Sequence, residues 1–222
     1  MSLKLGDVAP EFVADSTIGK IDFHKYIEGS WSILFSHPND FTPVCTTELG
    51  AVGVNLPEFQ KRGVKVLALS CNGVESHKAW IKDIESYTPG ASIAYPIISD
   101  PDRELAVKFG MLDPDEKDAS GVPLTARAVF IFGPDKKLKL SFLYPATTGR
   151  NFVEVLRVID SLQLTANHSV ATPVNWNHGD KCMVVPSLSN EQAAAKFPKG
   201  FEQVEVPSGK GYIRLTPQPN VA

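Results

Sequence analysis

Apolar and polar positions along the chain repeat with strand and helix periods in alternation. Apolar or alternating runs predict strands at residues 19–24, 32–36, 64–70, 95–98, 126–132 and 138–144. Apolar residues spaced three and four apart predict helices from about Cys45 to Gly63, around 79–87, around 105–109 and around 152–162. This order predicts an α/β fold with a central sheet flanked by helices, and the hairpin turn at 133–137 makes the sheet mixed.

Local signals predict where several of these elements begin and end. Gly63 is expected to close the first long helix, as a glycine just past a helix end commonly does. Asn72 with Glu75 three residues later resembles a capping box, and Asp100 followed by proline is typical of a helix start. Residues 113–123 hold prolines, a glycine and several acids, and are expected to form an exposed loop.

The composition changes near residue 166. Six prolines interrupt the remainder of the chain, at positions 173, 186, 198, 207, 217 and 219. They leave room for one helix, at 190–197. We therefore expect a main domain at 1–165 and a small C-terminal extension domain at 166–222. About 55 residues do not easily bury a core of their own, so the extension is expected to pack on the main domain or on a second subunit.

Charge and composition narrow the class of protein. The 222 residues are 43% hydrophobic and carry a net charge of −3, which gives no basic field to attract nucleic acid or an anionic membrane. No apolar run approaches the ~20 residues of a membrane span, and no secretory signal is visible. Three widely spaced cysteines form neither a disulfide framework nor a zinc cluster. These features predict a cytoplasmic protein with free thiols and no stable membrane insertion.

The stretch around Cys45 is the strongest candidate for chemistry. A buried strand at 32–36 leads into a polar loop, and a helix begins near Cys45. The first-turn N–H groups and the helix dipole favour an anion there, so this thiol is expected to lose its proton readily. Thr42 offers a hydroxyl, and Pro38 stiffens the loop. The alternative is an inert cysteine, because cysteine is among the most often buried residues.

The spacing Pro38-x-x-x-Thr42-x-x-Cys45 resembles the peroxidatic motif of the peroxiredoxins. Residues 35–49 as a whole are similar to the one-cysteine, peroxiredoxin-6-type subfamily. Three segments of the extension also resemble that subfamily, at 172–176, 197–200 and 211–219. The resemblance implies a thioredoxin-like fold and a homodimer built by the extension.

The resemblance also implies a thiol-dependent peroxidase for hydrogen peroxide and organic or lipid hydroperoxides. Cys45 is the expected nucleophile, oxidised to a sulfenic acid, and Thr42 is expected to orient the peroxide. Arg127, Arg150 and His37 match family positions near the thiol. By residue type alone, Arg127 equally suits a strand end in solvent, Arg150 a solvent-exposed loop, and His37 simple packing.

Regeneration of the thiol is expected to need no cofactor. The resemblance implies an external thiol, with glutathione delivered by a glutathione transferase as the family's preferred route. Cys71 or Cys182 are alternative partners, since either thiol can in principle form a disulfide with the sulfenic acid. The tail lacks the Val-Cys-Pro resolving motif of two-cysteine relatives, so both are expected to be structural.

Two other functions remain open from the sequence. Ser30, His24 and Asp135 match the positions of a phospholipase A2 activity carried by some subfamily members. However, both glycines of the lipase-type Gly-x-Ser-x-Gly are missing around Ser30, and Gly29 stands where a His-x4-Asp signature needs its acid. The other function is a non-catalytic redox sensor or binding protein, which fold alone does not exclude.

Overall fold

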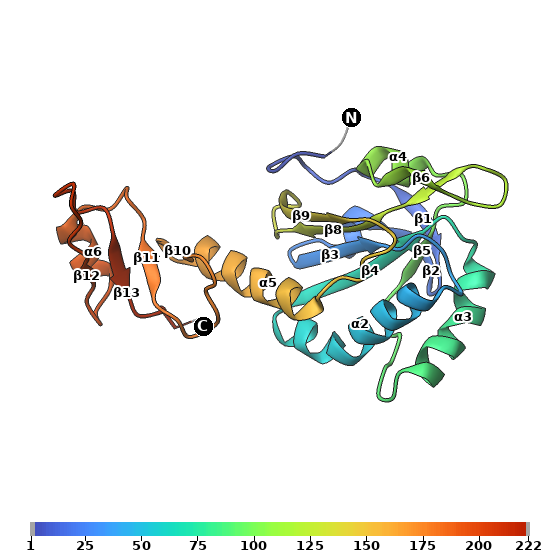
Figure 1. The fold of residues 1–222 in the computed structure, drawn as a ribbon, viewed down its shortest axis with the longest axis horizontal. Coiled ribbons are helices and arrows are strands. Elements are labelled where there is room, and N and C mark those ends of the chain that lie inside the picture. Colours follow the sequence, from blue (N-terminus) through green and yellow to red (C-terminus); the bar gives the residue numbers. More distant parts are fainter. Residues whose placement is uncertain (1–2, 221–222) are drawn as a thin grey trace. The chain divides into compact units, whose positions relative to one another are not determined.

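The structure, a computed structural model, describes residues 3–220 and divides into two compact units between Phe152 and Val153 (Figure 1). The sequence predicts a boundary at 165/166 instead. The difference is helix α5 (Phe152–Asn167), which runs with the second unit from its second residue onward.

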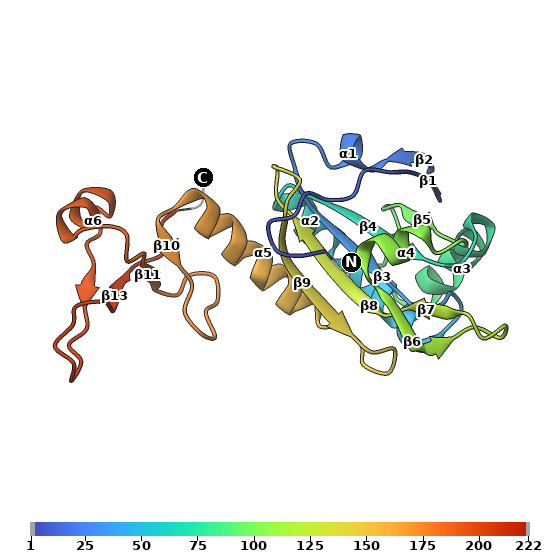
Figure 2. The ribbon, with the colours of Figure 1, turned by 90° about the horizontal axis from the view of Figure 1, so that it is seen from above.

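A seven-stranded mixed sheet forms the centre of the first unit, in the order β2-β1-β5-β4-β3-β8-β9 (Figures 1 and 2). Its strands are β1 (Val13–Ser16), β2 (Gly19–Asp22), β3 (Trp31–Ser36), β4 (Val64–Ser70), β5 (Ile97–Ser99), β8 (Arg127–Phe132) and β9 (Leu138–Tyr144). Strands β3, β4 and β5 are parallel, whereas β8 pairs antiparallel with both β3 and β9. The predicted α/β fold with a mixed sheet is confirmed.

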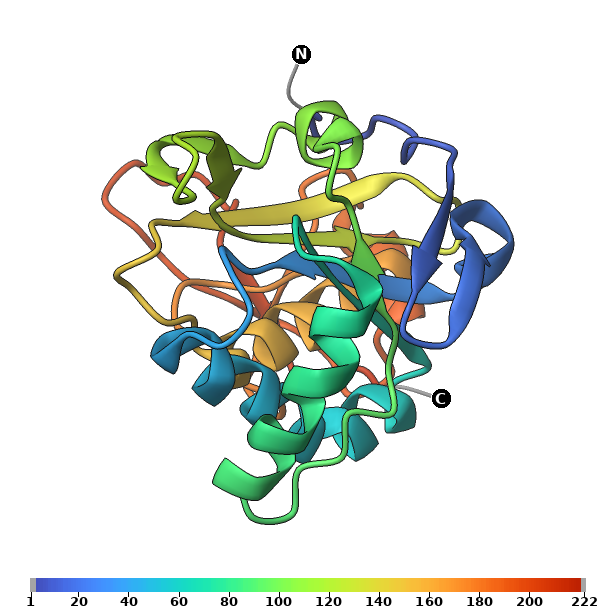
Figure 3. The ribbon, with the colours of Figure 1, turned by 90° about the vertical axis from the view of Figure 1, so that its right-hand side faces the viewer.

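Helices cover both faces of this sheet. Figure 3 shows α2 (Pro43–Lys61) and α3 (Val74–Tyr87) on one face and α4 (Glu104–Phe109) on the other. A further short helix, α1 (Phe23–Tyr26), follows β2 and is capped by the Asp22 carboxylate. The core between α4 and the sheet is rich in aromatic rings, with Phe12 and Phe23 stacked at 4.7 Å between centroids. Stacked and edge-on rings bury large apolar areas, so this layer contributes strongly to stability.

Two predicted helix starts differ from the structure. Helix α3 has Gly73 at its N-cap without a side-chain cap. The proposed box at Asn72 is wrong because the Asn72 side chain bonds Asn39 and the Asp40 amide instead. Helix α4 begins after Arg103, not at Asp100, although the Asp100 carboxylate accepts hydrogen bonds from two of the helix's first-turn N–H groups. The aspartate thus caps the helix from outside it.

The segment 113–123 is not the loop that its composition suggested. Strand β6 (Leu112–Lys117) pairs antiparallel with β7 (Pro123–Thr125). Arg103 supports this hairpin, because its Nη2 lies 2.6 Å from the Asp118 carboxylate and its Nε donates to the Pro123 carbonyl. The ending of α2 is as predicted: Gly63 takes a positive φ of 64° and its N–H bonds the Gln60 carbonyl.

The second unit joins helix α5 to a four-stranded antiparallel sheet in the order β10-β11-β13-β12. These strands are β10 (Val170–Ala171), β11 (Cys182–Val184), β12 (Glu202–Gln203) and β13 (Arg214–Thr216). Helix α6 (Asn190–Lys196) fits the prediction and begins with a capping box at Ser189. Contrary to expectation, the unit buries a small core of its own, including Trp176 and Leu164 of α5. Within residues 3–220, no helix has the length and apolar character needed to span a membrane.

Candidate active site

Cys45 lies in the first turn of α2, and its side chain is fully buried. Thr42 occupies the N-cap with extended backbone, and Pro43 fixes the first helical residue. The first backbone hydrogen bond of helix α2 runs from the Thr46 N–H to the Thr42 carbonyl. The N–H groups of Val44 and Cys45 therefore have no carbonyl within the helix to bond.

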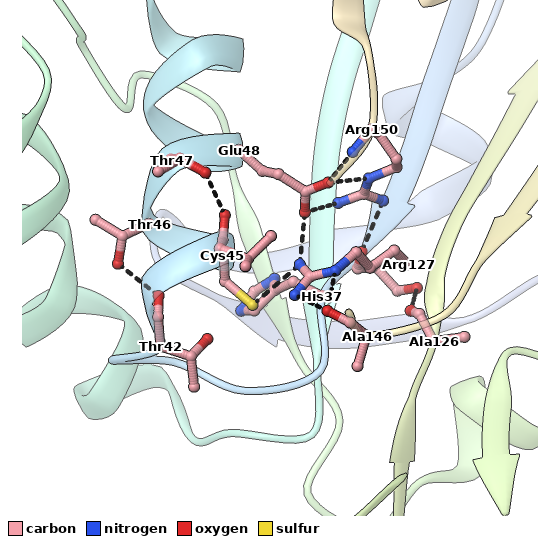
Figure 4. Close-up of polar contacts among 12 residues, drawn as sticks. His37, Thr42, Cys45, Thr46, Thr47, Glu48, Ala126, Arg127, Ala146 and Arg150 are labelled. Atoms are coloured by element: carbon pink, nitrogen blue, oxygen red, sulfur yellow. Dashed lines mark hydrogen bonds and ion pairs between the residues drawn. The ribbon is translucent and has the colours of Figure 1, made fainter. Parts of the chain in front are cut away.

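Arg127, the first residue of β8, contacts the Cys45 thiol (Figure 4). Its Nη1 lies 3.3 Å from Sγ and 2.7 Å from a carboxylate oxygen of Glu48. Its Nε and Nη2 both donate to the carbonyl of Ala146. The guanidinium is therefore buried and fixed at the thiol, and does not lie in solvent.

Arg150 donates three hydrogen bonds to the Glu48 carboxylate. Its Nε and backbone N–H donate to Glu48 Oε1 at 2.9 and 2.7 Å, and its Nη2 donates to Oε2 at 2.7 Å. Its Nη1 bonds the carbonyls of Ser36 and Ala128. Arg150 is thus buried, and it connects α2 to strands β3 and β8.

Glu48 is the central residue of this ion network. Burial alone would raise the pKa of its carboxyl, but the charge and hydrogen bonds of Arg150, together with the charge of Arg127, lower it. From the sequence we expect Glu48 only to cap its helix or to form an ion pair. Its position one turn after Cys45 does not reveal that its partners are two arginines distant along the chain. Two guanidinium groups and one carboxylate leave one positive charge beside Cys45. A buried charge of this sign stabilises an anion more strongly than it would in water.

Thr42 and Pro38 shape the loop in front of the thiol. The Thr42 hydroxyl donates to the Asn39 carbonyl at 2.8 Å, so its oxygen can still accept a hydrogen bond from a ligand. The Thr42 carbonyl accepts the Thr46 hydroxyl, which in turn accepts the indole N–H of Trp80. Pro38 is buried at the end of β3. The loop is therefore held rigidly between β3 and α3.

His37 belongs to a second buried network, centred on Asp40. The Nε2 of His37 lies 2.8 Å from Asp40 Oδ1, and the Nδ1 of His77 lies 2.7 Å from Oδ2. Burial raises the pKa of the Asp40 carboxyl, but these two histidine hydrogen bonds outweigh burial and hold the pKa well below its usual range. Sequence reasoning assigned Asp40 no role of its own and missed His77, because His77 reaches the site only through the packing of α3.

The same three residues are the group, within the described part of the chain, whose side chains could be considered for a metal ion. Their nearest nitrogen and oxygen atoms are already hydrogen-bonded to one another at 2.7 and 2.8 Å. The donor atoms therefore point at each other and not at a common position for an ion.

The other cysteines differ from Cys45 in their surroundings. All three thiols are free. Burial raises the pKa of Cys71 to about 11, and burial also raises the pKa of Cys182. A thiol with a raised pKa holds less thiolate at neutral pH and reacts more slowly.

The residues of the alternative hydrolase set are bonded elsewhere. His24 Nε2 bonds the carbonyl of Ala9 at 2.7 Å, and Asp135 pairs with Lys139 at 2.6 Å. The Ser30 hydroxyl faces the carbonyl of Glu28 at 3.4 Å. A serine hydrolase needs its serine, histidine and acid bonded in sequence, so this arrangement does not favour lipid hydrolysis.

Comparisons with known proteins match the chain over almost its whole length. The model of the AhpC/TSA family matches residues 5–141, and the model of the C-terminal domain of 1-Cys peroxiredoxin matches residues 161–200. Peroxiredoxin-6 of Gallus gallus is 64% identical and that of Homo sapiens 61% identical, each match covering 98% of both chains.

Solved structures agree with these matches. A cysteine-to-serine mutant of Peroxiredoxin 6 of Arenicola marina superposes with a TM-score of 0.96 at 61% identity, covering 99% of this chain and 100% of that one. A yeast mitochondrial 1-Cys peroxiredoxin superposes with a TM-score of 0.86 at 44% identity, covering 97% and 99%.

The ion network predicts that stability depends on the charge of Glu48. Because the folded-state pKa of Glu48 is lowered, its contribution is present above the usual glutamate pKa and is lost as the pH falls through the folded value. The free energy of unfolding should therefore fall as the pH drops from about 5 to about 3, and Glu48→Gln should cost about 3–5 kcal/mol at neutral pH.

Urea unfolding at several pH values, followed by circular dichroism, measures both effects. The exposed Glu58, paired with Arg62 at the end of the same helix, gives a matched control, since Glu58→Gln should cost far less than Glu48→Gln. Equal losses in the two variants would contradict a structural role for the network.

Proposed function

This chain belongs to the AhpC/TSA family, in its one-cysteine, peroxiredoxin-6-type branch, and is a thiol peroxidase with a thioredoxin-like fold, and from that premise we propose that Cys45 is its peroxidatic residue. One observation carries the proposal: the Cys45 sulfur lies in the first turn of α2, 3.3 Å from the fixed guanidinium of Arg127. A nucleophile and donors for the leaving oxygen thus share one buried position.

The reaction follows from these groups. The Cys45 thiolate attacks the distal oxygen of a hydroperoxide, so an S–O bond forms while the O–O bond breaks. The sulfur loses two electrons and becomes a sulfenic acid, and the departing oxygen leaves as an alcohol or water once it gains a proton. Negative charge gathers on that oxygen during the step. Arg127 and the open N–H groups of Val44 and Cys45 supply donors without reorganisation.

Thr42, Pro38 and Arg150 have supporting roles in this proposal. The Thr42 hydroxyl donates its own proton to the Asn39 carbonyl. Its oxygen therefore accepts a hydrogen bond from the O–H group of the bound hydroperoxide and orients it. Pro38 keeps the loop rigid and removes a competing donor. Arg150 fixes Glu48, which in turn fixes Arg127.

Replacement of Cys45 tests the assignment directly. Cys45→Ser should abolish peroxidase activity, whereas Cys71→Ser and Cys182→Ser should keep most of it, because burial raises the pKa of both other thiols. One equivalent of peroxide followed by dimedone should give a single adduct at Cys45, read by mass spectrometry. A fully active Cys45→Ser protein would contradict the assignment, whereas a disulfide from Cys45 to either other cysteine would keep Cys45 as the nucleophile and reveal an internal resolving cysteine.

The proposal includes regeneration by an external thiol, with glutathione as the reductant and a glutathione transferase as its carrier, and no bound cofactor. Support comes from the raised pKa values of Cys71 and Cys182 and from the one-cysteine family match. The yeast relative is described as resolved through glutathione and thioredoxin systems. A cytoplasmic location, where glutathione keeps thiols reduced, completes this proposal.

Single-turnover recycling distinguishes the reductants. Cys45 sulfenic acid, prepared with one equivalent of peroxide, should return to thiol with glutathione and a glutathione transferase faster than with glutathione alone, because a carrier supplies the thiolate at a buried site. Free-thiol mass spectrometry follows the return. Recycling by thioredoxin with none by glutathione would overturn this part of the proposal.

We also propose a homodimer built with the C-terminal extension. The second unit exposes large apolar side chains, with Val174 87% and Tyr212 60% accessible in the single chain. Such residues on a small unit are suited to a protein interface.

Sedimentation equilibrium tests the dimer. The reduced protein should have twice the 24.2 kDa mass of one chain at micromolar concentration. Val174→Asp should weaken association by removing apolar contact, whereas Val13→Asp on β1, at a valine that is also exposed, serves as a control. A monomer at every concentration would contradict the proposal.

A further inference from the structure

An open groove lies beside the active-site loop, between that loop and the end of α3. It has a volume of about 440 Å³ and is lined by residues 41–44, by Thr46 and Thr47, and by Tyr87, the last residue of α3. None of these lining residues carries a charge. Thr42 is one of them, so the groove begins at the residue to which the proposed function gives the hydroperoxide group.

The hydroxyl groups of the groove already donate hydrogen bonds within the protein. The Thr46 hydroxyl donates to the Thr42 carbonyl at 2.8 Å (Figure 4). The Thr47 hydroxyl donates to the Val44 carbonyl at 2.7 Å, and the Thr42 hydroxyl donates to the Asn39 carbonyl. The remaining lining is mainly apolar, with a proline ring, a valine and two aromatic rings. Such a surface favours a ligand that has apolar area to remove from water.

Phe41 is held in a backbone conformation that bulky residues rarely adopt. Its φ is 53°, in the left-handed region, and 55% of its surface is exposed. Hydrogen bonds on both sides keep the loop in this shape, from the Asp40 N–H to the Asn72 side chain and from the Thr42 hydroxyl to Asn39. Glycine would take this conformation at lower cost. An exposed phenyl ring at a strained position beside Thr42 therefore calls for a role other than stabilising the fold.

Two aromatic rings bound the groove, one from the loop and one from α3. The Phe41 ring packs on Trp80 of α3, with 6.3 Å between ring centroids. Tyr87 lies about two turns further along the same helix and is 65% exposed. Helix α3 thus supports the first ring and carries the second.

We propose that Phe41 and Tyr87 are specificity-determining residues, which bind the organic part of an alkyl or aryl hydroperoxide along this groove while Thr42 holds its O–O–H group. The contribution of the organic part to binding grows with the apolar area that it removes from water. Hydrogen peroxide has no organic part and gains nothing from the groove. The inference rests on the proposed function of Cys45 and identifies how the site recognises one class of its substrates.

The size and position of the groove favour a substrate over a protein partner. A volume of about 440 Å³ lies within the range of about 300–1,000 Å³ that is typical of small-molecule sites. The groove is also continuous with the reaction site, because Thr42 belongs to both. A chain bound in it is therefore attached to the group that Cys45 attacks.

Straight-chain alkyl hydroperoxides from ethyl to hexyl test the inference. They share one reacting group, so a change of rate with chain length reports the binding of the chain. The second-order rate of Cys45 oxidation in the full-length protein should rise about 10- to 20-fold from ethyl to hexyl. This corresponds to about twofold for each added methylene, since an open groove buries each one only in part. Acid quenching followed by free-thiol mass spectrometry measures the rate.

Variants of Tyr87 locate the effect in the groove. Tyr87→Ala should lower the hexyl-to-ethyl rate ratio to below about threefold, because one wall of the groove is lost. Tyr87→Phe keeps the ring and should restore the wild-type ratio. Val107→Ala is the control, because Val107 is a 59% exposed apolar residue of α4, which covers the other face of the sheet (Figure 3). It should keep the wild-type ratio.

Phe41→Gly removes the second ring. Glycine readily takes the positive φ of this position, so the variant is expected to fold, and its hexyl-to-ethyl ratio should also fall below about threefold. This variant tests the inference independently of any effect of Tyr87→Ala on helix α3.

The possible outcomes separate this inference from the proposed function. A hexyl-to-ethyl ratio near one in the wild-type protein, or the wild-type ratio in both Tyr87→Ala and Phe41→Gly, would refute the inference and leave Cys45 as the peroxidatic residue. An unchanged ratio with an altered sedimentation mass would assign the groove to a second copy, and one with slower recycling by glutathione transferase would assign it to that carrier. Either result would also refute the inference. Failure of wild-type Cys45 to be oxidised by hydrogen peroxide would instead contradict the proposed function, and this inference with it.

Discussion

The buried contact between Glu48 and its two arginines is the constraint on which the site depends. One carboxylate connects helix α2 to the start of strand β8 and to the segment before α5, through Arg127 and Arg150. Removing one partner from such a buried set leaves an uncompensated charge, which costs several kcal/mol. The position of the guanidinium at Cys45 is therefore determined by the same interaction that joins these elements of the first unit.

This network gives the site a net positive charge and fixes the direction in which Arg127 donates its hydrogen bonds. Arg127 shares one nitrogen between Glu48 and the Cys45 sulfur, and its other nitrogens are held by the Ala146 carbonyl. A free arginine side chain would lose rotamer entropy each time it met an anion. Here that cost is met during folding, and donors aimed at a developing charge act best when they need not move.

The parts of the site that were predictable are those that lie within one short segment. Pro38, Thr42 and Cys45 share a loop and a helix start, so their spacing alone indicates a reactive thiol. Arg127 lies 82 residues from Cys45 and was indicated only by family resemblance, since no local pattern separates it from a strand-end arginine. Asp40 lies in that same segment but was assigned no role, and its partner His77 was not indicated because side-chain pairing with α3 leaves no periodic signal. The same limit explains the error at Asn72, whose side chain bonds the active-site loop in place of capping its own helix.

Two buried carboxylates eight residues apart, Asp40 and Glu48, lie on either side of Cys45 in the sequence and have different kinds of partner. Glu48 meets guanidinium groups, which never release a proton at physiological pH, so its network keeps a fixed charge. Asp40 meets imidazole nitrogens of His37 and His77, which hydrogen-bond its two carboxylate oxygens. The Glu48 network places positive charge at the thiol, and the Asp40 network joins the active-site loop to helix α3 through His77. One short segment of loop and helix thus carries the two anchors, and the rest of the first unit supplies the basic side chains that give each anchor its chemistry.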